Sequence, residues 1–509
     1  MYNCVHTTNI NGIKASLVKV EADILRGLPG FIIVGLPDTS VNEAKERVKA
    51  ALLNAGLKLP PGKITVNLSP AELKKNGSCF DLPIAISLLA ACGEIEPIEK
   101  EHKMILTGEL GLDGKINPLR SVLPVILTGI NNGIRDFIIP YANKDQIFDI
   151  KDTNIYLAKD LEEIIDFFKG NKDLELFSGN KKESDDHIND YCPDLSEVSG
   201  QYAAKRALEI AAAGGHNMLL LGSPGCGKTM LARRIPGILP PLSEKESIET
   251  SLIYASSGKF GVKRSLFTER PFRSPHHTIS NIALIGGGSN PQPGEVSLAH
   301  NGVLFLDELT EFNKSTIEVL RQPLSDKKVN ISRTLDCTTF PANFMLIAAA
   351  NPCPCGFLFD KKKYCTCSYQ QRERYRQKLS GPLMDRFDII MQLTRVPPEE
   401  LIEHNKSENS STVRKRVMSA RKLQKQRFKD LNIHTNSELS PSQITTFCKL
   451  TKKQLNILKL AIDRFDLSAR GYYKTLKLAR TIADLEGSLN ITEPAILEAI
   501  SYRKIEDWN

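Results

Sequence analysis

The stretch with the clearest chemical meaning is GSPGCGKT at residues 222–229, which follows the apolar run MLLL and precedes the helix-like MLARRI. It fits G-x-x-x-x-G-K-[ST] in the strand, loop and helix setting that this pattern requires. Its glycines let backbone N–H groups turn inward around phosphates, while the lysine neutralises phosphate oxygens and the threonine hydroxyl reaches Mg²⁺. The sequence therefore predicts a nucleotide site lined by Gly222, Ser223, Pro224, Gly225, Cys226, Gly227, Lys228, Thr229 and Met230.

Two acidic residues follow a second strand-like run, VLFL at 303–306. A carboxylate at a strand end beside the phosphate loop is placed to hold the Mg²⁺ shell together with Thr229, and we assign this role to Asp307. The next carboxylate, Glu308, can polarise the attacking water. A third apolar strand, 344–350, ends at Asn351, whose amide can orient that water; taken alone, this asparagine is an ordinary strand-end residue.

Two arginines stand in segments that suit contact with a γ-phosphate. Arg386 lies in SGPLMDRFD and Arg470 in LSARGYYKTLKLART, and without the other motifs both would be surface cations. An arginine that reaches the phosphate from a neighbouring subunit makes hydrolysis depend on assembly. The predicted catalytic set is therefore Lys228, Asp307, Glu308, Asn351, Arg386 and Arg470.

Four of the eleven cysteines are clustered in the pattern CPC-x9-CTC, at Cys353, Cys355, Cys365 and Cys367. Two thiolate pairs joined by a short loop can close a tetrahedral zinc site, although C-x-C is tighter than the common C-x-x-C. Free thiols and a disulfide-based redox switch remain open alternatives.

Composition limits the remaining possibilities. A chain of 509 residues is too long for one hydrophobic core. With 41% apolar and 25% charged residues, and no run near the ~20 apolar residues of a membrane span, we expect a cytoplasmic protein without a membrane partner. The net charge is +8, and residues 409–429 hold eight Lys or Arg and no acid, which suits either a phosphate-bearing partner or a solvated helix face.

The pattern along the chain predicts an α/β protein in several parts. Residues 1–170 alternate strand-like runs (31–34, 64–67, 104–107, 137–140) with helix-like segments (41–54, 82–91). Residues 171–193 are polar and read as a linker, and a second α/β unit covers 194–396. After Pro397-Pro398 the remainder, 397–509, is helical, with amphipathic spacing in 454–464 and 473–485.

The motifs together resemble a known family. In their order along the chain they resemble the AAA+ ATPases. GQYAAKRALEIAAAGGHNMLLLGSPGCGKT, PFRSPHHTIS, PGEVSLAHNGVLFLDEL, AAANPCPCG and SGPLMDRFD resemble more narrowly the magnesium-chelatase-like branch and its bacterial YifB/ComM family. The resemblance implies an AAA+ P-loop core with a helical lid, ATP and Mg²⁺ as cofactors, Arg386 as arginine finger, Arg470 as sensor-2 and Asn351 as sensor-1 residue.

For partners, the resemblance implies a nucleotide-dependent homo-oligomer, a hexameric ring, that moves single- or double-stranded DNA and junctions. It would promote branch migration or unwinding in homologous recombination and natural transformation. A β-hairpin before the sensor-1 strand faces the pore in this branch, and here it corresponds to residues 327–340. Lys327, Lys328 and Arg333 are therefore candidate DNA contacts, or else ordinary hairpin charges. A metal-insertion motor like the magnesium chelatase ATPase subunit is the alternative function.

The N-terminal segment, with LPGFIIVGLPD and ITVNLSPAELKKNGSCFDLPIA, resembles the Lon-protease-like (ribosomal S5 domain 2-like) domain. Lon-type proteolysis needs a serine nucleophile and a lysine base. Here the nucleophile position falls at Cys79, beside Ser78, and the lysine position falls near Leu123. We therefore expect a non-proteolytic scaffold, with an ATP-dependent protease as a remote alternative. For the tandem His276-His277 we expect a structural or coupling role rather than metal binding.

Overall fold

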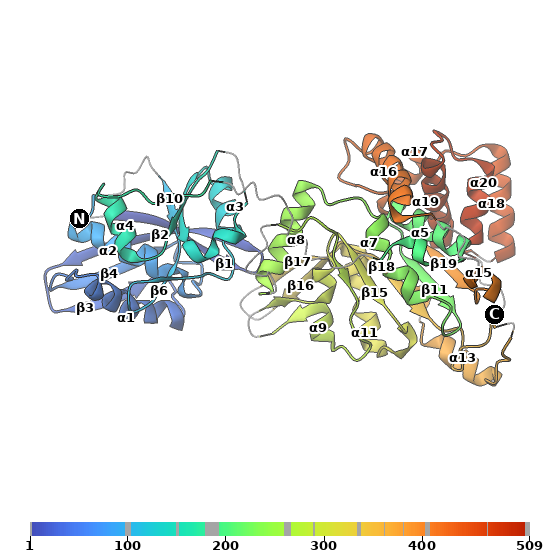
Figure 1. Cartoon of the computed structure of the whole chain (residues 1–509), viewed down its shortest axis with the longest axis horizontal. Coiled ribbons are helices and arrows are strands. Elements are labelled where there is room, and N and C mark those ends of the chain that lie inside the picture. The colour runs from blue at the N-terminus through green and yellow to red at the C-terminus, as the bar shows by residue number, and fades with distance from the viewer. Residues whose placement is uncertain are drawn as a thin grey trace. The chain divides into compact units, whose positions relative to one another are not determined.

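The structure is a computed structural model that describes residues 3–96, 103–148, 152–178, 193–258, 266–288, 291–332, 337–360, 362–379, 381–402, 408–465 and 467–503. The chain forms two compact units, one of residues 1–185 and 247–267 and the other of 186–246 and 268–509. Helix α8 (Glu244–Ser256) begins in the second unit and continues in the first. Figure 1 labels the elements of both units.

The first unit is a mixed eight-stranded sheet with helices on its faces. Its strand order is β10-β9-β8-β5-β1-β2-β4-β3. The strands are β1 (Asn3–Asn11), β2 (Lys14–Leu25), β3 (Gly30–Val34), β4 (Lys63–Ser69), β5 (Met104–Leu106), β8 (Asp136–Pro140), β9 (Asn154–Ala158) and β10 (Glu175–Leu176). The helices are α1 (Thr39–Asn54), α2 (Asp81–Cys92), α3 (Leu123–Asn131) and α4 (Leu161–Phe168), and a small ribbon joins β6 (Glu109–Leu110) to β7 (Ile116–Asn117).

The strands and helices expected from residues 31 to 140 are confirmed, whereas the longest strands of the unit were missed. Strands β1 and β2 form a hairpin in which Asn11 pairs with Lys14 around the two residues between them. Gly12 is the first of these two loop residues and has a positive φ of +63°, as the first residue of a type II′ hairpin turn requires. Strand β10 lies inside the segment predicted to be a linker. Its backbone pairs with β9, but its side chains, Glu175 and Leu176, are exposed, so the sequence showed no buried strand there.

The second unit is built on a parallel sheet of order β12-β15-β18-β11-β19. These strands are β11 (Met218–Gly222), β12 (Phe272–Arg273), β15 (Val303–Leu306), β18 (Met345–Ala350) and β19 (Ile389–Leu393). Strands β11, β15 and β18 are buried along their whole length, as expected for central strands covered on both faces. Alternate residues point to opposite faces, so Leu220 and Leu221 belong to different hydrophobic clusters.

Short elements fill the edges of this sheet. They are α6 (Lys228–Ala232), α7 (Ile235–Ile238), α9 (Asn281–Ile285), β13 (Gly286–Gly287), β14 (Gln292–Pro293), α10 (Glu295–Leu298), α11 (Lys314–Glu318), α12 (Arg321–Asp326), α13 (Tyr369–Gln377), α14 (Gly381–Met384) and α15 (Pro398–Ile402). The expected hairpin before the sensor-1 strand is present as β16 (Lys328–Ser332) paired with β17 (Cys337–Pro341).

The C-terminal part is helical, as predicted, and packs on the sheet through α5 (Tyr202–Gly214). Its helices are α16 (Ser410–Arg427), α17 (Pro441–Phe447), α18 (Lys452–Phe465), α19 (Ala469–Leu485) and α20 (Glu493–Ser501). Figure 1 shows α5 between these orange and red helices and the sheet, and α5 contacts α16, α19 and β19. The fold class predicted from the sequence is therefore confirmed. Within the described part of the chain, no helix is both long and apolar enough to cross a membrane.

Candidate nucleotide site

The phosphate loop leaves the carboxyl end of β11 and enters α6. Gly225 and Gly227 have φ of +77° and +94°, a backbone conformation that side chains with a Cβ rarely adopt, so glycine is required at both turns. The N–H of Cys226 donates to the carbonyl of Ser223 at 3.3 Å and tightens the loop. Helix α6 is shorter than the sequence pattern predicts, because Pro236 has no N–H to donate to Ala232.

The side chain of Lys228 lies over this loop. Its Nζ donates to the carbonyls of Gly222 at 2.6 Å and Ser223 at 3.1 Å, and to Oδ1 of Asn351 at 3.0 Å. Burial lowers the pKa of Lys228 below its ordinary value. The structure thus brings the predicted sensor-1 asparagine to the predicted P-loop lysine, across the neighbouring strands β11 and β18.

Thr229 and Asp307 meet beside the lysine. Thr229 Oγ1 donates to Asp307 Oδ2 at 2.7 Å. In octahedral Mg²⁺ coordination at 2.0–2.1 Å, adjacent ligand oxygens are about 2.9 Å apart. These two oxygens therefore fit neighbouring positions of a magnesium shell, and both belong to chain segments that follow carboxyl ends of parallel strands.

Glu308 follows Asp307 in the chain, and its carboxylate meets a histidine. Its backbone has φ +52°, and its side chain is 59% exposed. Oε2 lies 3.7 Å from Nδ1 of His277, whose ring lies against that of His276 at a centroid distance of 4.0 Å and an interplanar angle of 35°. The contact arises because β12 runs parallel to β15, so the chain that leaves β12 emerges beside the chain that leaves β15.

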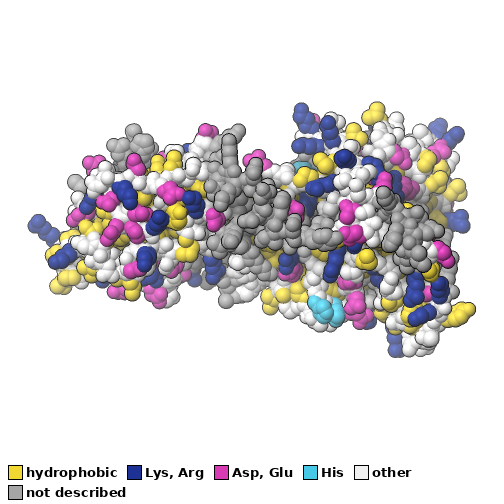
Figure 2. Space-filling model, in the orientation of Figure 1, with side chains coloured by type: hydrophobic (Ala, Val, Ile, Leu, Met, Phe, Trp, Pro, Cys, Tyr) yellow, Lys and Arg dark blue, Asp and Glu magenta, His cyan; other side chains and the backbone are white. Residues whose placement is uncertain are grey.

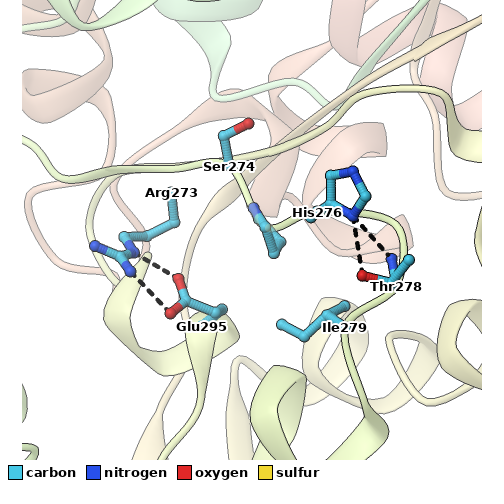
Figure 3. A pocket seen from close by; sticks show the side chains of 7 residues that line it. Arg273, Ser274, His276, Thr278, Ile279 and Glu295 are labelled. Atoms are coloured by element: carbon cyan, nitrogen blue, oxygen red, sulfur yellow. Dashed lines mark hydrogen bonds and ion pairs between the residues drawn. The ribbon is translucent and has the colours of Figure 1, made fainter.

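The segment around His276 forms one wall of a small open pocket of about 330 Å³ (Figure 3). Arg273 donates to Glu295 through Nε at 2.6 Å, and His276 Nδ1 lies 2.9 Å from the Thr278 hydroxyl. Both interactions tie the segment to itself and to the start of α10. They support the expected structural role of the histidine pair, and His277 adds a contact with a predicted catalytic residue that the sequence did not indicate.

The two predicted arginines lie together at another part of the unit. Arg470, at the start of α19, contacts Asp385 through NH1 at 3.3 Å, and Asp385 precedes Arg386 in the chain. Nε of Arg386 is buried and has no hydrogen-bond partner among the described residues. The next turn of α19 adds an ion pair of 2.9 Å between Lys474 and Asp388. Helix α19 therefore holds the Arg386 segment from two successive turns.

A buried polar cluster anchors this segment to the sheet. Asp388 Oδ2 accepts the N–H of Asn217 at 3.1 Å and lies 3.5 Å from His216 Nδ1, while His216 Nε2 is 2.8 Å from the Thr481 hydroxyl. Burial disfavours the charged carboxylate, but Lys474 and His216 outweigh it and hold the pKa of Asp388 far below its ordinary value. Burial lowers the pKa of His216.

The four clustered cysteines converge as the sequence predicts for a metal site. Their sulfur atoms all lie within 4.8 Å of one another. Cys353 Sγ is 3.4 Å from that of Cys355 and 3.6 Å from that of Cys365, and the N–H of Cys355 donates to Cys367 Sγ at 3.3 Å. Sulfur atoms around a tetrahedral Zn²⁺ at ~2.3 Å would be about 3.8 Å apart, so this set fits the ion closely.

The predicted DNA contacts have different surroundings. Nζ of Lys327 forms an ion pair with Glu438 of the helical part, whereas Lys328 is exposed at the start of β16. Arg333 lies outside the described residues. The ion pair occupies Lys327 within its own chain, so Lys328 has the freer side chain of the two described lysines.

The basic helix predicted near residues 413–428 is α16, and its arginines and lysines have separate roles. Arg416 bonds Glu209 and Glu408, Arg421 bonds the carbonyl of Ala212, and Arg427 bonds Asp484. The lysines are exposed instead, at Lys415, Lys422 and Lys425. Figure 2 shows Lys and Arg side chains gathered over this edge of the helical part.

Comparison with known proteins decides the family. Residues 194–401 match the model of magnesium chelatase, subunit ChlI, while 20–143 match subunit ChlI of Mg-chelatase and 407–503 match its C-terminal part. The chain is 42% identical over 503 residues to the protein YifB of Escherichia coli, covering 99% of this chain and 97% of that protein. It is 42% identical over 495 residues to competence protein ComM of Haemophilus influenzae, covering 97% and 95%.

The chain belongs to the YifB/ComM family of magnesium-chelatase-like AAA+ ATPases. A shorter match, 24% identical over 166 residues and 30% of this chain, is to Lon protease 2 of Thermus thermophilus. Membership of the YifB/ComM family implies ATPase activity with ATP and Mg²⁺. The structure brings Lys228 together with Asn351, and Thr229 together with Asp307, the residues that the sequence predicts would hold these two ligands.

The Lon-like unit of this YifB/ComM-family chain has no reactive nucleophile at the position where Lon-type proteases carry one. Cys79 is buried, its thiol donates to the carbonyl of Thr8 at 3.7 Å, and burial, with the Asp81 charge, raises its pKa to about 12. Ser78 donates its hydroxyl to Glu109. Leu123, which stands at the position of the lysine base, is buried and apolar and cannot act as a base. The thiol is thus protonated and enclosed at neutral pH.

Proposed function

We propose that the chain is a ring-forming, ATP-driven DNA motor that promotes branch migration or unwinding in homologous recombination and natural transformation. The observation that carries this proposal is similarity over nearly the whole length to a protein named for competence. The hydrogen bonds that bring Lys228 to Asn351 and Thr229 to Asp307 in the second unit also support it. Single-stranded DNA, duplexes and junctions are the proposed substrates, and of the two predicted DNA contacts that the structure describes, Lys328 is the better placed.

In this proposal each ATP is held between two subunits of a homo-hexamer whose assembly depends on nucleotide. Lys228 neutralises phosphate charge, Thr229 and Asp307 bind the Mg²⁺ shell, and Glu308 accepts a proton from the attacking water that Asn351 orients. Arg386 comes from the neighbouring subunit as the arginine finger, and Arg470 acts as the sensor-2 residue of the helical lid. Two observations support these roles. Arg470 contacts Asp385, the residue before Arg386, and Arg386 Nε has no hydrogen-bond partner among the described residues.

The shared site can be tested by mixing two inactive variants. Arg386→Ala lacks the finger and Lys228→Ala lacks phosphate binding, so each alone should lose hydrolysis. A mixture should recover part of the activity, because an intact Lys228 of one subunit can face an intact Arg386 of another. No recovery in a mixed ring would contradict the contribution of Arg386 from a neighbour.

DNA and metal-insertion functions differ in what stimulates hydrolysis. The family models named for magnesium chelatase make metal insertion the second candidate. We expect four-way junctions or single-stranded DNA to raise the ATPase rate several-fold, with a tetrapyrrole-bound protein partner having no effect. Stimulation by the tetrapyrrole-bound partner and not by DNA would favour the metal-insertion function instead.

We also propose Zn²⁺ as a structural cofactor held by Cys353, Cys355, Cys365 and Cys367, supported by their sulfur spacing. Elemental analysis of protein expressed with zinc should find close to one zinc per chain. A content near zero would favour free thiols, and a disulfide detected by mass spectrometry would favour the redox alternative.

A further inference from the structure

The cysteine cluster and helix α13, which follows it in the chain, meet the nucleotide site at three points. The first point is covalent, since Asn351 and Cys353 are two residues apart. Asn351 Oδ1 accepts a hydrogen bond from Lys228 Nζ at 3.0 Å. Cys353 is fully buried, so it holds in place the chain that directly follows the sensor-1 strand.

The second point is the close approach of Gly356 to the phosphate loop. The N–H of Gly356 donates to the carbonyl of Cys353 at 2.9 Å, which closes a turn inside the cluster. A Cβ at Gly356 would lie 2.6 Å from Cδ of Pro224, well inside van der Waals contact. Only glycine fits here, so the cysteine loop rests directly on the P-loop.

The third point lies beyond the second cysteine pair. Helix α13 starts with a capping box between Ser368 and Gln371, immediately after Cys367. Its Tyr375 hydroxyl lies 2.5 Å from the hydroxyl of Thr310, and Lys378 Nζ donates to the Thr310 carbonyl at 3.2 Å. Thr310 is two residues after Glu308, so α13 supports the segment that carries the predicted catalytic base.

From these contacts we propose that metal bound at the four cysteines braces the nucleotide site, so that its loss weakens ATP binding and slows hydrolysis. The metal closes the loop between the two cysteine pairs. This loop then holds Asn351 and contacts Pro224, while α13 contacts Thr310. The proposal rests on the zinc site of the proposed function. It adds that this zinc acts on the ATP site of the same subunit.

The first arm of the test removes the metal from the full chain. Cys365→Ser with Cys367→Ser should abolish zinc binding and weaken binding of a fluorescent ATP analogue by about tenfold or more, because the loop loses its closure. Cobalt substitution gives an independent readout, since thiolate-bound Co²⁺ absorbs in the visible and this absorbance should vanish in the variant. A variant without zinc that binds the analogue as tightly as the wild type overturns the proposal.

The second arm keeps the metal and disturbs the contact. Gly356→Ala should retain zinc yet weaken analogue binding by about tenfold, because the new Cβ displaces Pro224. Gly487→Ala is the matched control, since Gly487 has a similar positive φ (+69°, against +82° at Gly356) but open space around its Cβ position. Unchanged binding in a zinc-loaded Gly356→Ala protein overturns the brace even if the double cysteine variant misfolds.

The third arm tests α13 through turnover. Tyr375→Phe keeps the ring and removes the hydroxyl that meets Thr310, so we expect kcat to fall several-fold with zinc content unchanged. These outcomes separate the two proposals. Wild-type protein without zinc would refute the zinc site itself, whereas zinc-loaded protein whose variants keep full ATP binding and turnover would refute only the brace.

Discussion

Each unit of this chain buries charged or reactive side chains, but in the second they lie at the ends of parallel strands beside an exposed carboxylate. In the first unit, Asp81 is fully buried and accepts Arg47 Nε at 2.7 Å, and Cys79 is enclosed beside it. In the second, Lys228 and the Thr229–Asp307 pair lie where parallel strands end, and Glu308 is exposed. The difference teaches that a family resemblance to a protease domain transfers the fold, while catalysis needs accessible groups.

The largest effect that can test this contrast is expected at Glu308. Glu308→Gln keeps the size and shape of the side chain but cannot accept the proton from water, so kcat should fall by about 10³-fold. ATP binding should persist because Lys228 and Thr229 are unchanged. Steady-state hydrolysis and analogue binding measure the two separately, and full turnover in this variant would remove Glu308 from the catalytic assignment.

The first unit should instead respond in stability. Arg47→Ala leaves the buried Asp81 carboxylate with one backbone donor, the N–H of Leu110, and should destabilise the unit by about 3 kcal/mol. Hydrogen exchange of β4 amides in rising denaturant would measure this. Lys115→Ala is the control, since its ion pair with Asp113 is exposed to solvent and should contribute little to stability. Equal effects of the two substitutions would mean that the buried pair is not special.

A smaller effect is expected at the former nucleophile position. Cys79→Ala removes one buried sulfur, so we expect a loss of about 1 kcal/mol in stability and no change in ATP hydrolysis. Casein should remain intact with wild type and variant alike. Casein degradation that persists in Lys228→Ala but disappears in Cys79→Ala would restore the protease alternative.

The smallest effect is a difference in thiol labelling. Burial raises the pKa of Cys79 to about 12, so an alkylating reagent at pH 8 should leave it unmodified in native protein. Burial also disfavours the Cys355 thiolate, but the N–H groups of Phe357 and Thr366 outweigh this and lower its pKa to about 6. In metal-free protein Cys355 should therefore label early, as peptide mass spectrometry would report. Faster labelling of Cys79 would contradict the enclosed first unit.

The sequence was most informative where chemistry is local. The phosphate loop is one continuous motif, and the strand runs before Asp307 and Asn351 implied that their ends would meet, because carboxyl ends of parallel strands share one sheet edge. The cysteine cluster was also predictable, since corresponding members of its two pairs are only twelve residues apart. In these cases short-range pattern and sheet geometry together determine the arrangement.

Contacts between distant segments could not be predicted in this way. Strand β12 has only two residues, too few to give a periodic pattern of apolar residues. The contact between His277 and Glu308 could therefore not be predicted from the sequence. Lys327 is 111 residues from its partner Glu438, and Arg470 is 85 residues from Asp385. Such pairs depend on how the helical part docks on the sheet, which a single sequence does not encode locally.

The most direct test of the central claim is branch migration by the purified chain on a labelled four-way junction. Wild-type protein with ATP and Mg²⁺ should convert the junction to its products, and Cys79→Ala should do so at the same rate. Glu308→Gln and Lys228→Ala should leave the junction intact. Conversion by Glu308→Gln, or loss of conversion in a folded Cys79→Ala protein, would contradict a DNA motor driven by the ATP site of the second unit.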